Sequence, residues 1–405
     1  MKLIYQGKLY ESVFSQETEN KILNAIKSAK KYASNAENKL YRVGGSVRDE
    51  LLGVESKDID YLVTNVALDE LKKALEPISD NIVSTNVGES MQVIKAVIDG
   101  SDEPYDFAIP RTEKYGGSGT HTDVIATGDP SIPVEEELGR RDLTINAIAY
   151  NVETHLLVDP FGGVHDIHNK LLKAVGNPNE RFSEDPLRIL RVLQFANRFG
   201  FDIEPSTMSA IKNNVALLDN ITGERILEEF KKAFTKGNSK GNAKFIEMLI
   251  DTGIGTHVFG SGFDPVSVNI IYGDRWIVNM ILLFINGGDF AKMKPSTDVS
   301  TAISLAKSLT KSDPLAVMFK NERYLPVIKD AFKSMGDETL INKLNSLEGV
   351  PLSTRDLSIS SQFLMDNGYV GPRLGALQKN MINEIYLKHI RNDENDLKNY
   401  LDSLK

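Results

Sequence analysis

Two aspartates that follow a glycine-rich turn have the residue type and spacing of a reactive site in this 405-residue chain. Asp58 and Asp60 lie two positions apart and lead into the apolar run Tyr61-Leu62-Val63. Residues i and i+2 of a strand point to the same face, with their Cα atoms roughly 6.6 Å apart. Carboxylates placed in this way can hold Mg²⁺ next to substrate phosphates. Since carboxylates on an otherwise buried strand need a partner, Asp58 and Asp60 are predicted to bind metal.

A turn of the phosphate-binding kind precedes the two aspartates. The strand-like segment 40–43 runs into Gly44, Gly45 and Ser46, and a helix is predicted directly after them. Glycines let backbone N–H groups approach a ligand closely, and the N-terminus of a helix favours an anion. Arg48, in the first turn of that helix, can bind a phosphate through two charge-assisted hydrogen bonds. The alternative is a plain strand-to-helix turn with a surface arginine.

Two arginine-rich segments further along the chain contain other candidate residues. Asp185, Arg188 and Arg191 are spaced by three, so on a helix they spread over about 120° of one face. An aspartate accepts hydrogen bonds and an arginine donates them in a fixed fork, so such a pair can bind the edge of a nucleobase without a template. The alternative is a surface salt bridge. For the other segment, 140–142, the alternative to a phosphate site is a solvated charge cluster.

Strands and helices are expected in different parts of the chain. Short runs rich in valine, isoleucine and tyrosine predict strands at 40–43, 59–63, 91–98 and 145–150. From residue 184 onward apolar residues recur at helical spacing, and helical patterns continue to the C-terminus. This order predicts an α+β domain followed by an all-α region, and not an alternating α/β sheet. The stretch 100–133 shows neither pattern, and its polar part at 115–120 is hinge-like.

The composition excludes several classes of protein. The chain has 47 basic and 56 acidic residues, and its net charge of −9 argues against a protein that coats nucleic acid. The segment 225–244 nevertheless holds six basic residues against two glutamates, which is enough for a local RNA-binding stripe. Without cysteine there is no disulfide, thiol nucleophile or cysteine zinc site. No apolar stretch approaches the ~18 residues of a membrane span, and no signal-peptide pattern is present, so a cytoplasmic protein is expected.

Taken together, the motifs resemble the nucleotidyltransferase superfamily that includes class II CCA-adding tRNA nucleotidyltransferases and bacterial poly(A) polymerases. The resemblance is dense from Leu40 to about Phe234 and thinner beyond. It is carried, in order, by GGSVRDELLG at 44–53 with DID at 58–60, DFAIPR at 106–111, RRDLTINA at 140–147, DPFGG at 159–163, RFSEDPLRILR at 181–191, ERI at 224–226, and DL with GPRLG at 356–375.

The resemblance implies a fold and a division into domains. The expected fold class is α+β, with an N-terminal polymerase-beta-like nucleotidyltransferase head built on a small mixed sheet and an all-α neck, body and tail. The expected boundaries are 1–172 for the catalytic head, 173–240 for the neck, 241–345 for the body and 346–405 for the tail.

The resemblance also implies substrates and site residues. Asp58, Asp60 and Asp106 would be catalytic, and the first two would hold two Mg²⁺ ions. The triphosphate of CTP or ATP would bind at Gly44, Gly45, Ser46, Arg48, Arg141 and Asn146. The nucleobase would bind at Asp185, Arg188 and Arg191. The partner would be the 3′ end of tRNA, extended by CCA with release of pyrophosphate.

Several residues depart from the family pattern. Gln194 stands where many relatives carry a third arginine, so a phosphate or primer contact is expected to be missing there. Asp106 stands where the family often has glutamate, and the alternative for it is a solvent-facing loop carboxylate. The glycine-rich loop 116–120 would move as the RNA end grows. The dipeptide His165-Asp166 falls in the turn after DPFGG and does not indicate the metal hydrolase domain of some relatives.

Other functions share part of this evidence. A poly(A) polymerase would carry the same head motifs, and so would an enzyme that adds only A or only CC. The C-terminal part has no strongly basic extension of the kind expected for processive tailing, which favours CCA addition. A catalytically dead RNA-binding scaffold is a third hypothesis, but a scaffold would need neither the Asp58/Asp60 pair nor the Asp185/Arg188 pair.

Overall fold

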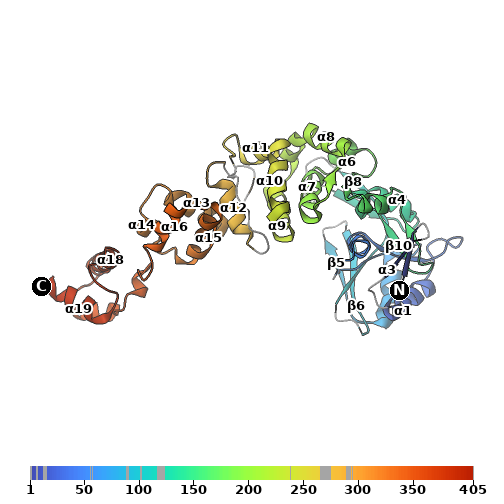
Figure 1. Cartoon of the computed structure of the whole chain (residues 1–405). Coiled ribbons are helices and arrows are strands. Elements are labelled where there is room, and N and C mark those ends of the chain that lie inside the picture. Colours follow the sequence, from blue (N-terminus) through green and yellow to red (C-terminus); the bar gives the residue numbers. More distant parts are fainter. Residues whose placement is uncertain are drawn as a thin grey trace. The chain divides into compact units, whose positions relative to one another are not determined.

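The computed structural model describes residues 2–404 except for the segments 6–7, 12–15, 55, 57, 88–90, 101–102, 116–123, 238, 265–274, 289–292 and 294. The chain divides into two compact units (Figure 1). The first comprises Met1–Phe230 with Asp251–Ile254, and the second comprises Lys231–Ile250 with Gly255–Lys405. Every residue predicted above to bind nucleotide or metal belongs to the first unit.

A seven-stranded mixed sheet forms the centre of the first unit, in the order β11-β10-β3-β4-β7-β6-β5. Among these strands β4 and β7 pair in parallel, and the other neighbours are antiparallel. The bounds are β3 Lys39–Val43, β4 Asp60–Thr64, β5 Ser79–Val87, β6 Met91–Ile98, β7 Tyr105–Ala108, β10 Ala149–Asn151 and β11 Leu157–Val158. The predicted mixed sheet is thus confirmed.

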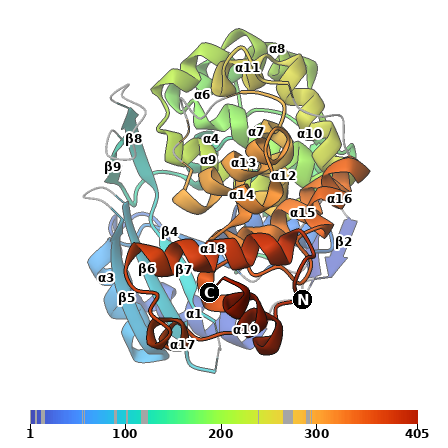
Figure 2. The same ribbon diagram turned by 90° about the vertical axis from the view of Figure 1, so that its left-hand side faces the viewer.

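The register of the sheet lines up charged residues on three adjacent strands, which run side by side in Figure 2. Asp60 of β4 is the direct partner of Asp106 of β7, and Asp106 is the direct partner of Lys95 of β6. Directly paired residues project to the same face of a sheet. These three side chains therefore form one row, which we call the acidic row.

Two helices cover the sheet, and a third follows β3 directly. Helices α1 (Gln16–Ser28) and α3 (Leu68–Leu75) pack against each other and against β3 and β6. Each helix buries one apolar face, because apolar residues recur at helical spacing within it: Ile22 and Ile26 in α1, and Leu71 and Leu75 in α3. Helix α2 (Gly45–Leu51) begins in the glycine turn after β3, within two residues of the start predicted from the sequence.

Arg42, the next-to-last residue of β3, joins these helices to the sheet through buried charges. Its Nε lies 2.8 Å from Oε1 of Glu19 in α1, and its Nη1 donates to Oε2 of Glu50 in α2 at 2.6 Å. Its guanidinium also stacks over the ring of Tyr150, 4.5 Å from the centroid. Burial raises the pKa of Glu19, although the charge of Arg42 opposes this shift. The group holds α2, and with it the glycine turn, against the sheet.

Two longer segments differ from their predicted secondary structure. The segment 145–150 is not one strand: a 3-10 helix, η3 (Thr144–Asn146), precedes the short strand β10. Side chains impose this turn, because Thr144 donates to Asp166 and Asn146 donates to Asp142. The stretch 100–133 is largely strand, with β7 followed by the antiparallel ribbon of β8 (Arg111–Tyr115) and β9 (Val124–Gly128). The hinge-like segment 116–120 lies outside the described residues.

The ribbon β8–β9 was missed because its strand residues show no apolar alternation. Ion pairs hold the ribbon in place: Glu113 of β8 lies 2.8 Å from Arg111 and 2.6 Å from Arg140. Arg140 follows α4 (Val134–Gly139) and also pairs with Glu137 of that helix. Ion pairs between charged residues therefore fix the position of this ribbon, whereas packing of apolar side chains fixes the strands of the central sheet.

The remaining elements are mostly helical, as predicted. In the first unit they are α5 (Gly163–His168), α6 (Pro178–Glu184), α7 (Leu187–Phe199) and α8 (Pro205–Asn213), with α9 (Gly223–Lys236) starting there, and with the small strand pairs β1 (Lys2–Tyr5) with β2 (Lys8–Glu11) and β12 (Leu171–Leu172) with β13 (Asp202–Ile203). No helix in the described ranges is long and apolar enough to cross a membrane.

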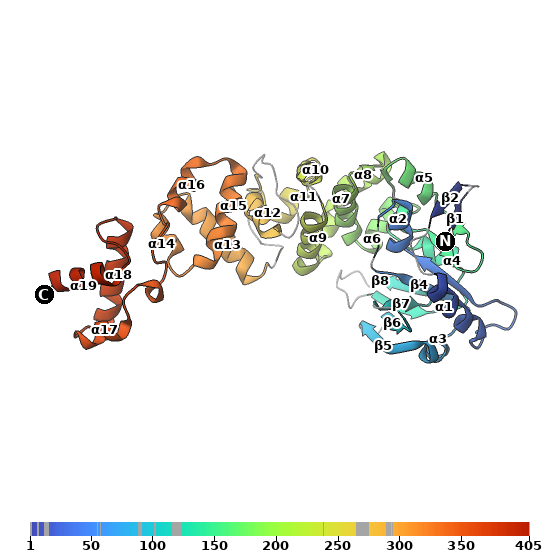
Figure 3. The same cartoon turned by 60° about the horizontal axis from the view of Figure 1, so that its bottom comes forward.

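The described residues of the second unit form helices and the loops between them, with no strand (Figure 3). Its helices are α10 (Ser239–Asp251), α11 (Ile254–Phe259), α12 (Trp276–Phe284), α13 (Thr297–Leu309), α14 (Pro314–Met318), α15 (Leu325–Met335), α16 (Glu338–Asn345), α17 (Ser361–Asp366), α18 (Pro372–Tyr386) and α19 (Glu394–Ser403). The α+β then all-α order is confirmed, and the domain boundaries at 172, 240 and 345 stay predictions.

Gly163, the last residue of the DPFGG segment, supports η3 by its lack of a side chain. A Cβ at this position would lie 2.1 Å from the carbonyl oxygen of Thr144 and 2.9 Å from Cγ1 of Ile148. We therefore expect Gly163→Ala to lower the free energy of unfolding by about 1–3 kcal/mol, because the 3-10 helix must shift. Urea unfolding followed by circular dichroism measures this loss. Gly375→Ala, which adds a Cβ in open space on α18, is the matched control, and equal losses for both variants would contradict the prediction.

Candidate functional site

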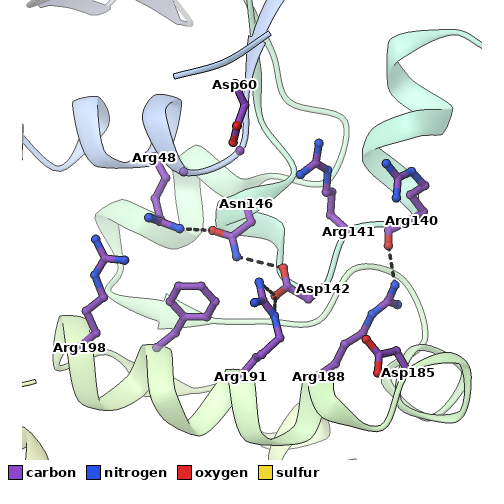
Figure 4. A pocket seen from close by; sticks show the side chains of 13 residues that line it. Arg48, Asp60, Arg140, Arg141, Asp142, Asn146, Asp185, Arg188, Arg191 and Arg198 are labelled. Atoms are coloured by element: carbon purple, nitrogen blue, oxygen red, sulfur yellow. Dashed lines mark hydrogen bonds and ion pairs between the residues drawn. The ribbon is translucent and has the colours of Figure 1, made fainter. Parts of the chain in front are cut away.

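A pocket of about 350 Å³ lies in the first unit, between the glycine turn, the end of the sheet and helix α7 (Figure 4). Asp60 points into it from one side, and the arginines of α7 point into it from the other. The lining residues are Gly44, Gly45, Arg48, Asp60, Arg140, Arg141, Asp142, Asn146, Asp185, Arg188, Arg191, Phe195 and Arg198. Of the predicted site residues, only Ser46, Asp58 and Asp106 are absent from this lining.

The glycine turn shapes one wall of the pocket. Gly44 has a φ of 71°, in the left-handed region that glycine adopts without strain, and a Cβ there would lie 3.4 Å from Nη1 of Arg141. Ser46 is buried, and its hydroxyl donates to the carbonyl oxygen of Val43 at 3.2 Å. The backbone of the turn therefore faces the pocket, whereas the Ser46 side chain braces the turn from within.

A chain of polar side chains forms the floor of the pocket. Arg48 donates to Oδ1 of Asn146, and Nδ2 of Asn146 donates to Oδ1 of Asp142 at 2.9 Å. Arg191 binds the other oxygen of Asp142 through Nε at 2.8 Å and Nη2 at 2.7 Å. Burial alone would raise the pKa of Asp142, but the charge of Arg191 and the hydrogen bonds from Asn146 and Arg191 outweigh it and lower the pKa to about 2. Asp142 is thus an ionised acceptor that orients residues from two segments.

Asp185 and Arg188 lie side by side at one end of the pocket (Figure 4). Asp185 is not helical, contrary to the spacing argument, because Pro186 disfavours helical backbone in the residue before it. Its Oδ1 accepts from the backbone N–H of Leu187 at 3.2 Å and lies 3.4 Å from Nη2 of Arg225. Arg188 donates to Oε2 of Glu184 at 3.0 Å and to the carbonyl oxygen of Arg140 at 2.8 Å. Contacts with neighbouring protein groups therefore fix the positions of both side chains.

The acidic row reaches the pocket at Asp60, which is half-buried at the start of β4. Asp58 is exposed and precedes the strand, so the prediction that both aspartates share one strand face is wrong: β4 begins only at Asp60. Burial raises the pKa of Asp60, Arg141 opposes this shift, and the negative charges of Asp106 and Asp58 add to it. The three carboxylates thus repel one another across this end of the sheet, which favours a cation there.

The chemistry of these donors fits a magnesium ion that arrives with a substrate. Within the described residues, no group of three or more histidine, aspartate or glutamate side chains forms a ready-made metal site. Mg²⁺, however, is usually bound by one or two carboxylates together with substrate phosphates, and not by an all-protein cage. An accessible Asp60 with Asp106 as its neighbour matches this mode of binding.

The pocket also contains residues that were not among the predicted site residues. Arg198 lines it, and its Nη2 lies 3.2 Å from Oδ2 of Asp49 in α2. Phe195 lies between two arginines, with its ring centroid 5.3 Å from Cζ of Arg48 and 5.4 Å from Cζ of Arg191. The spacing 188, 191, 195, 198 follows one face of a helix, so this signal was present in the sequence. Gln194, by contrast, is buried and does not line the pocket.

Comparisons with known proteins agree with this architecture. Residues 40–173 match the family model of the poly(A) polymerase head domain, and residues 200–264 match that of the probable RNA- and SrmB-binding site of polymerase A. The chain is 38% identical to a multifunctional CCA protein of Stenotrophomonas maltophilia over 200 residues, which are 48% of this chain and 45% of that relative. The match thus spans about half the length of that protein.

Two further likenesses extend over most of the chain. The chain is 28% identical to a CCA-adding enzyme of Lactobacillus johnsonii over 87% of its own length and 90% of that protein. Its fold is similar to that of the Bacillus stearothermophilus CCA-adding enzyme solved in complex with CTP, with a TM-score of 0.68, 22% identity and coverage of 96% and 98% of the two chains. The segment 40–173 is therefore similar to the poly(A) polymerase head domain, and the chain as a whole shares the fold of the CCA-adding enzymes.

Proposed function

We propose that this protein adds or repairs the 3′-terminal CCA of tRNA, using CTP and ATP and no nucleic-acid template. The observation that carries the proposal is the pocket itself, in which Asp60, a floor of arginines and the Asp185/Arg188 pair face one nucleotide-sized space. The names of the similar proteins support CCA addition over the poly(A) polymerase alternative. The cytoplasm, where tRNA is the substrate at hand, is the proposed location.

The triphosphate is proposed to bind along the glycine turn and Arg141. Nε of Arg141 is buried and has no hydrogen-bond partner within the described residues, although its guanidinium lies near Asp60. An unpartnered buried donor is costly, and a phosphate oxygen in the pocket would satisfy it. Arg48 and Asn146 are hydrogen-bonded to each other, and their other N–H groups would donate to the phosphates and the sugar. Charge complementarity and positioning are the main contributions of a protein to this reaction.

The nucleobase is proposed to be selected by Asp185 and Arg188. Cytosine and adenine each carry an exocyclic amino group next to a ring nitrogen that accepts. A carboxylate can accept from the amino group while a guanidinium donates to the ring nitrogen, and guanine and uracil offer the opposite pattern. Because other residues hold both side chains in place, the pair meets the base with little reorganisation.

Two Mg²⁺ ions are proposed to bind at Asp58 and Asp60, with Asp106 as the third carboxylate. Bound metal would lower the pKa of the RNA 3′-hydroxyl and neutralise the charge of the departing pyrophosphate. The residues of the chain then have three tasks. Asp60 would keep the cation next to the reacting phosphate, and Arg141 would offset the negative charge of the triphosphate. Asp142 keeps Arg191 and Asn146 oriented through hydrogen bonds.

The proposed function predicts a defined product. With Mg²⁺ and CTP plus ATP, a tRNA lacking CCA should gain two C and one A and then stop, and a tRNA ending in CC should gain one A. Labelled nucleotides offered singly, followed by gel electrophoresis, measure this pattern, with oligo(A) as the competing acceptor. Long A tracts on oligo(A) would instead support a poly(A) polymerase, addition of only A or only CC a partial-specificity enzyme, and no incorporation a scaffold.

A further inference from the structure

The acidic row carries its own counter-ion. Nζ of Lys95 donates to both carboxylate oxygens of Asp106, at 2.6 and 2.8 Å. The register places the two residues directly opposite each other on β6 and β7, with Asp60 on the far side of Asp106. The row therefore reads positive, negative, negative, and its positive end is a lysine that the proposed mechanism does not use.

The pair between Lys95 and Asp106 is open to water. The Lys95 side chain is 47% exposed and that of Asp106 is 31% exposed. Ion pairs with this exposure contribute only about 0–1 kcal/mol, since both partners interact well with solvent. The register of the strands places the ammonium group at Asp106, but the pair contributes little binding energy. Another cation can therefore replace the ammonium group.

A divalent cation at Asp60 would lie on the opposite side of Asp106 from this ammonium group, because β7 stands between β4 and β6 in the sheet. Adjacent strands lie about 5 Å apart, so the two cations would flank one carboxylate, and their like charges repel across it. The same carboxylate, Asp106, would attract both cations.

We propose that Lys95 is a built-in competitor of the divalent cation for Asp106, which weakens metal binding to the free enzyme. The phosphates of an incoming nucleotide would then be needed to complete the metal site, and metal would bind mainly together with substrate. The inference rests on the proposed function in one respect, namely that a divalent cation binds at Asp60. The rival explanation is that Lys95 only ties β6 to β7.

Binding of Mn²⁺ to the nucleotide-free protein, followed by electron paramagnetic resonance of the free ion, tests this role without any activity measurement. Lys95→Met keeps the length of the side chain and removes its charge, and we expect it to bind Mn²⁺ about two- to fivefold more tightly than the wild type. Lys95→Arg, the matched control that retains the charge, should bind like the wild type. In an Asp106→Asn background the gain from Lys95→Met should shrink, because the contested carboxylate is gone.

The outcomes separate this inference from the proposed function. If Lys95→Met binds Mn²⁺ no more tightly than the wild type, the competition does not exist. A lower free energy of unfolding with unchanged Mn²⁺ affinity would identify Lys95 as a structural tie only. If Asp60→Asn leaves the Mn²⁺ affinity of Lys95→Met unchanged, the ion binds elsewhere, and the metal assignment of the proposed function fails instead.

Discussion

Replacing Asp60 by asparagine is expected to reduce nucleotide incorporation by about 10²–10³-fold or more, since removal of one electrostatic group from a reaction centre has effects of that size. Asparagine keeps the shape of the side chain and removes the negative charge through which Asp60 is proposed to hold Mg²⁺. Single-turnover incorporation of labelled CTP into a tRNA lacking CCA measures the loss.

The fold should survive this change, and thermal unfolding checks it. Burial and the charges of Asp106 and Asp58 raise the pKa of Asp60, so the folded protein disfavours its ionised form. A neutral asparagine removes that repulsion, and the melting temperature should stay the same or rise. Asp99→Asn, which changes an exposed aspartate just after β6, is the control and should keep full activity. Normal incorporation by Asp60→Asn would contradict the metal assignment.

Replacing Arg42 by methionine is expected to cause the largest loss of stability in the first unit. Arg42 is fully buried, and so are its two partners Glu19 and Glu50. Removing one member of a buried ion group leaves an uncompensated charge and typically costs about 3–5 kcal/mol. Urea unfolding at neutral pH measures this loss as a lower midpoint.

The loss should depend on pH in a direction that the buried glutamates set. Without Arg42 the pKa of Glu19, which burial already raises, rises further above its value in the unfolded chain, so the folded state binds more protons than the unfolded state. Stability then falls as pH rises through that interval, and the deficit of Arg42→Met should shrink as the pH is lowered from neutral toward the ordinary pKa of glutamate. The variant that combines Arg42→Met with Glu19→Gln and Glu50→Gln should recover part of the stability. A deficit independent of pH would show that lost packing, not charge, is responsible.

The parts of the fold that follow from local patterns could be predicted from the sequence. Strands β3, β4 and β6 are short apolar runs bounded by turn residues, and α7 has an apolar stripe over several turns. The glycine turn was predicted for the same reason, since strand, glycines and helix are consecutive. Helical spacing from residue 184 onward likewise predicted the all-α region, and the likeness of the motifs to a known superfamily added the mixed sheet.

What could not be predicted depends on contacts between distant segments. No local pattern reveals that Lys95 faces Asp106, because the register of β6 and β7 is set by the whole sheet. The ribbon β8–β9 was missed since Glu113 and Arg140 stabilise it through charge and not through apolar alternation. Asp58 was expected on a strand that begins two residues later. Arg198 is different, because its helical spacing from Arg191 was visible and was not used.

Asp185 and Arg188, which we propose select the base, are held by neighbouring groups that limit how this selection could change by mutation. Arg225 lies against the aspartate, while Glu184 and the backbone of Arg140 hold the arginine. A substitution at either position alone leaves these supporting groups without their partner and so disturbs folding before it creates a new preference. A variant that accepts a different base therefore needs coordinated changes in three separate segments. Selection for a new nucleotide would have to pass through poorly folded intermediates, which would make the proposed choice of bases resistant to change.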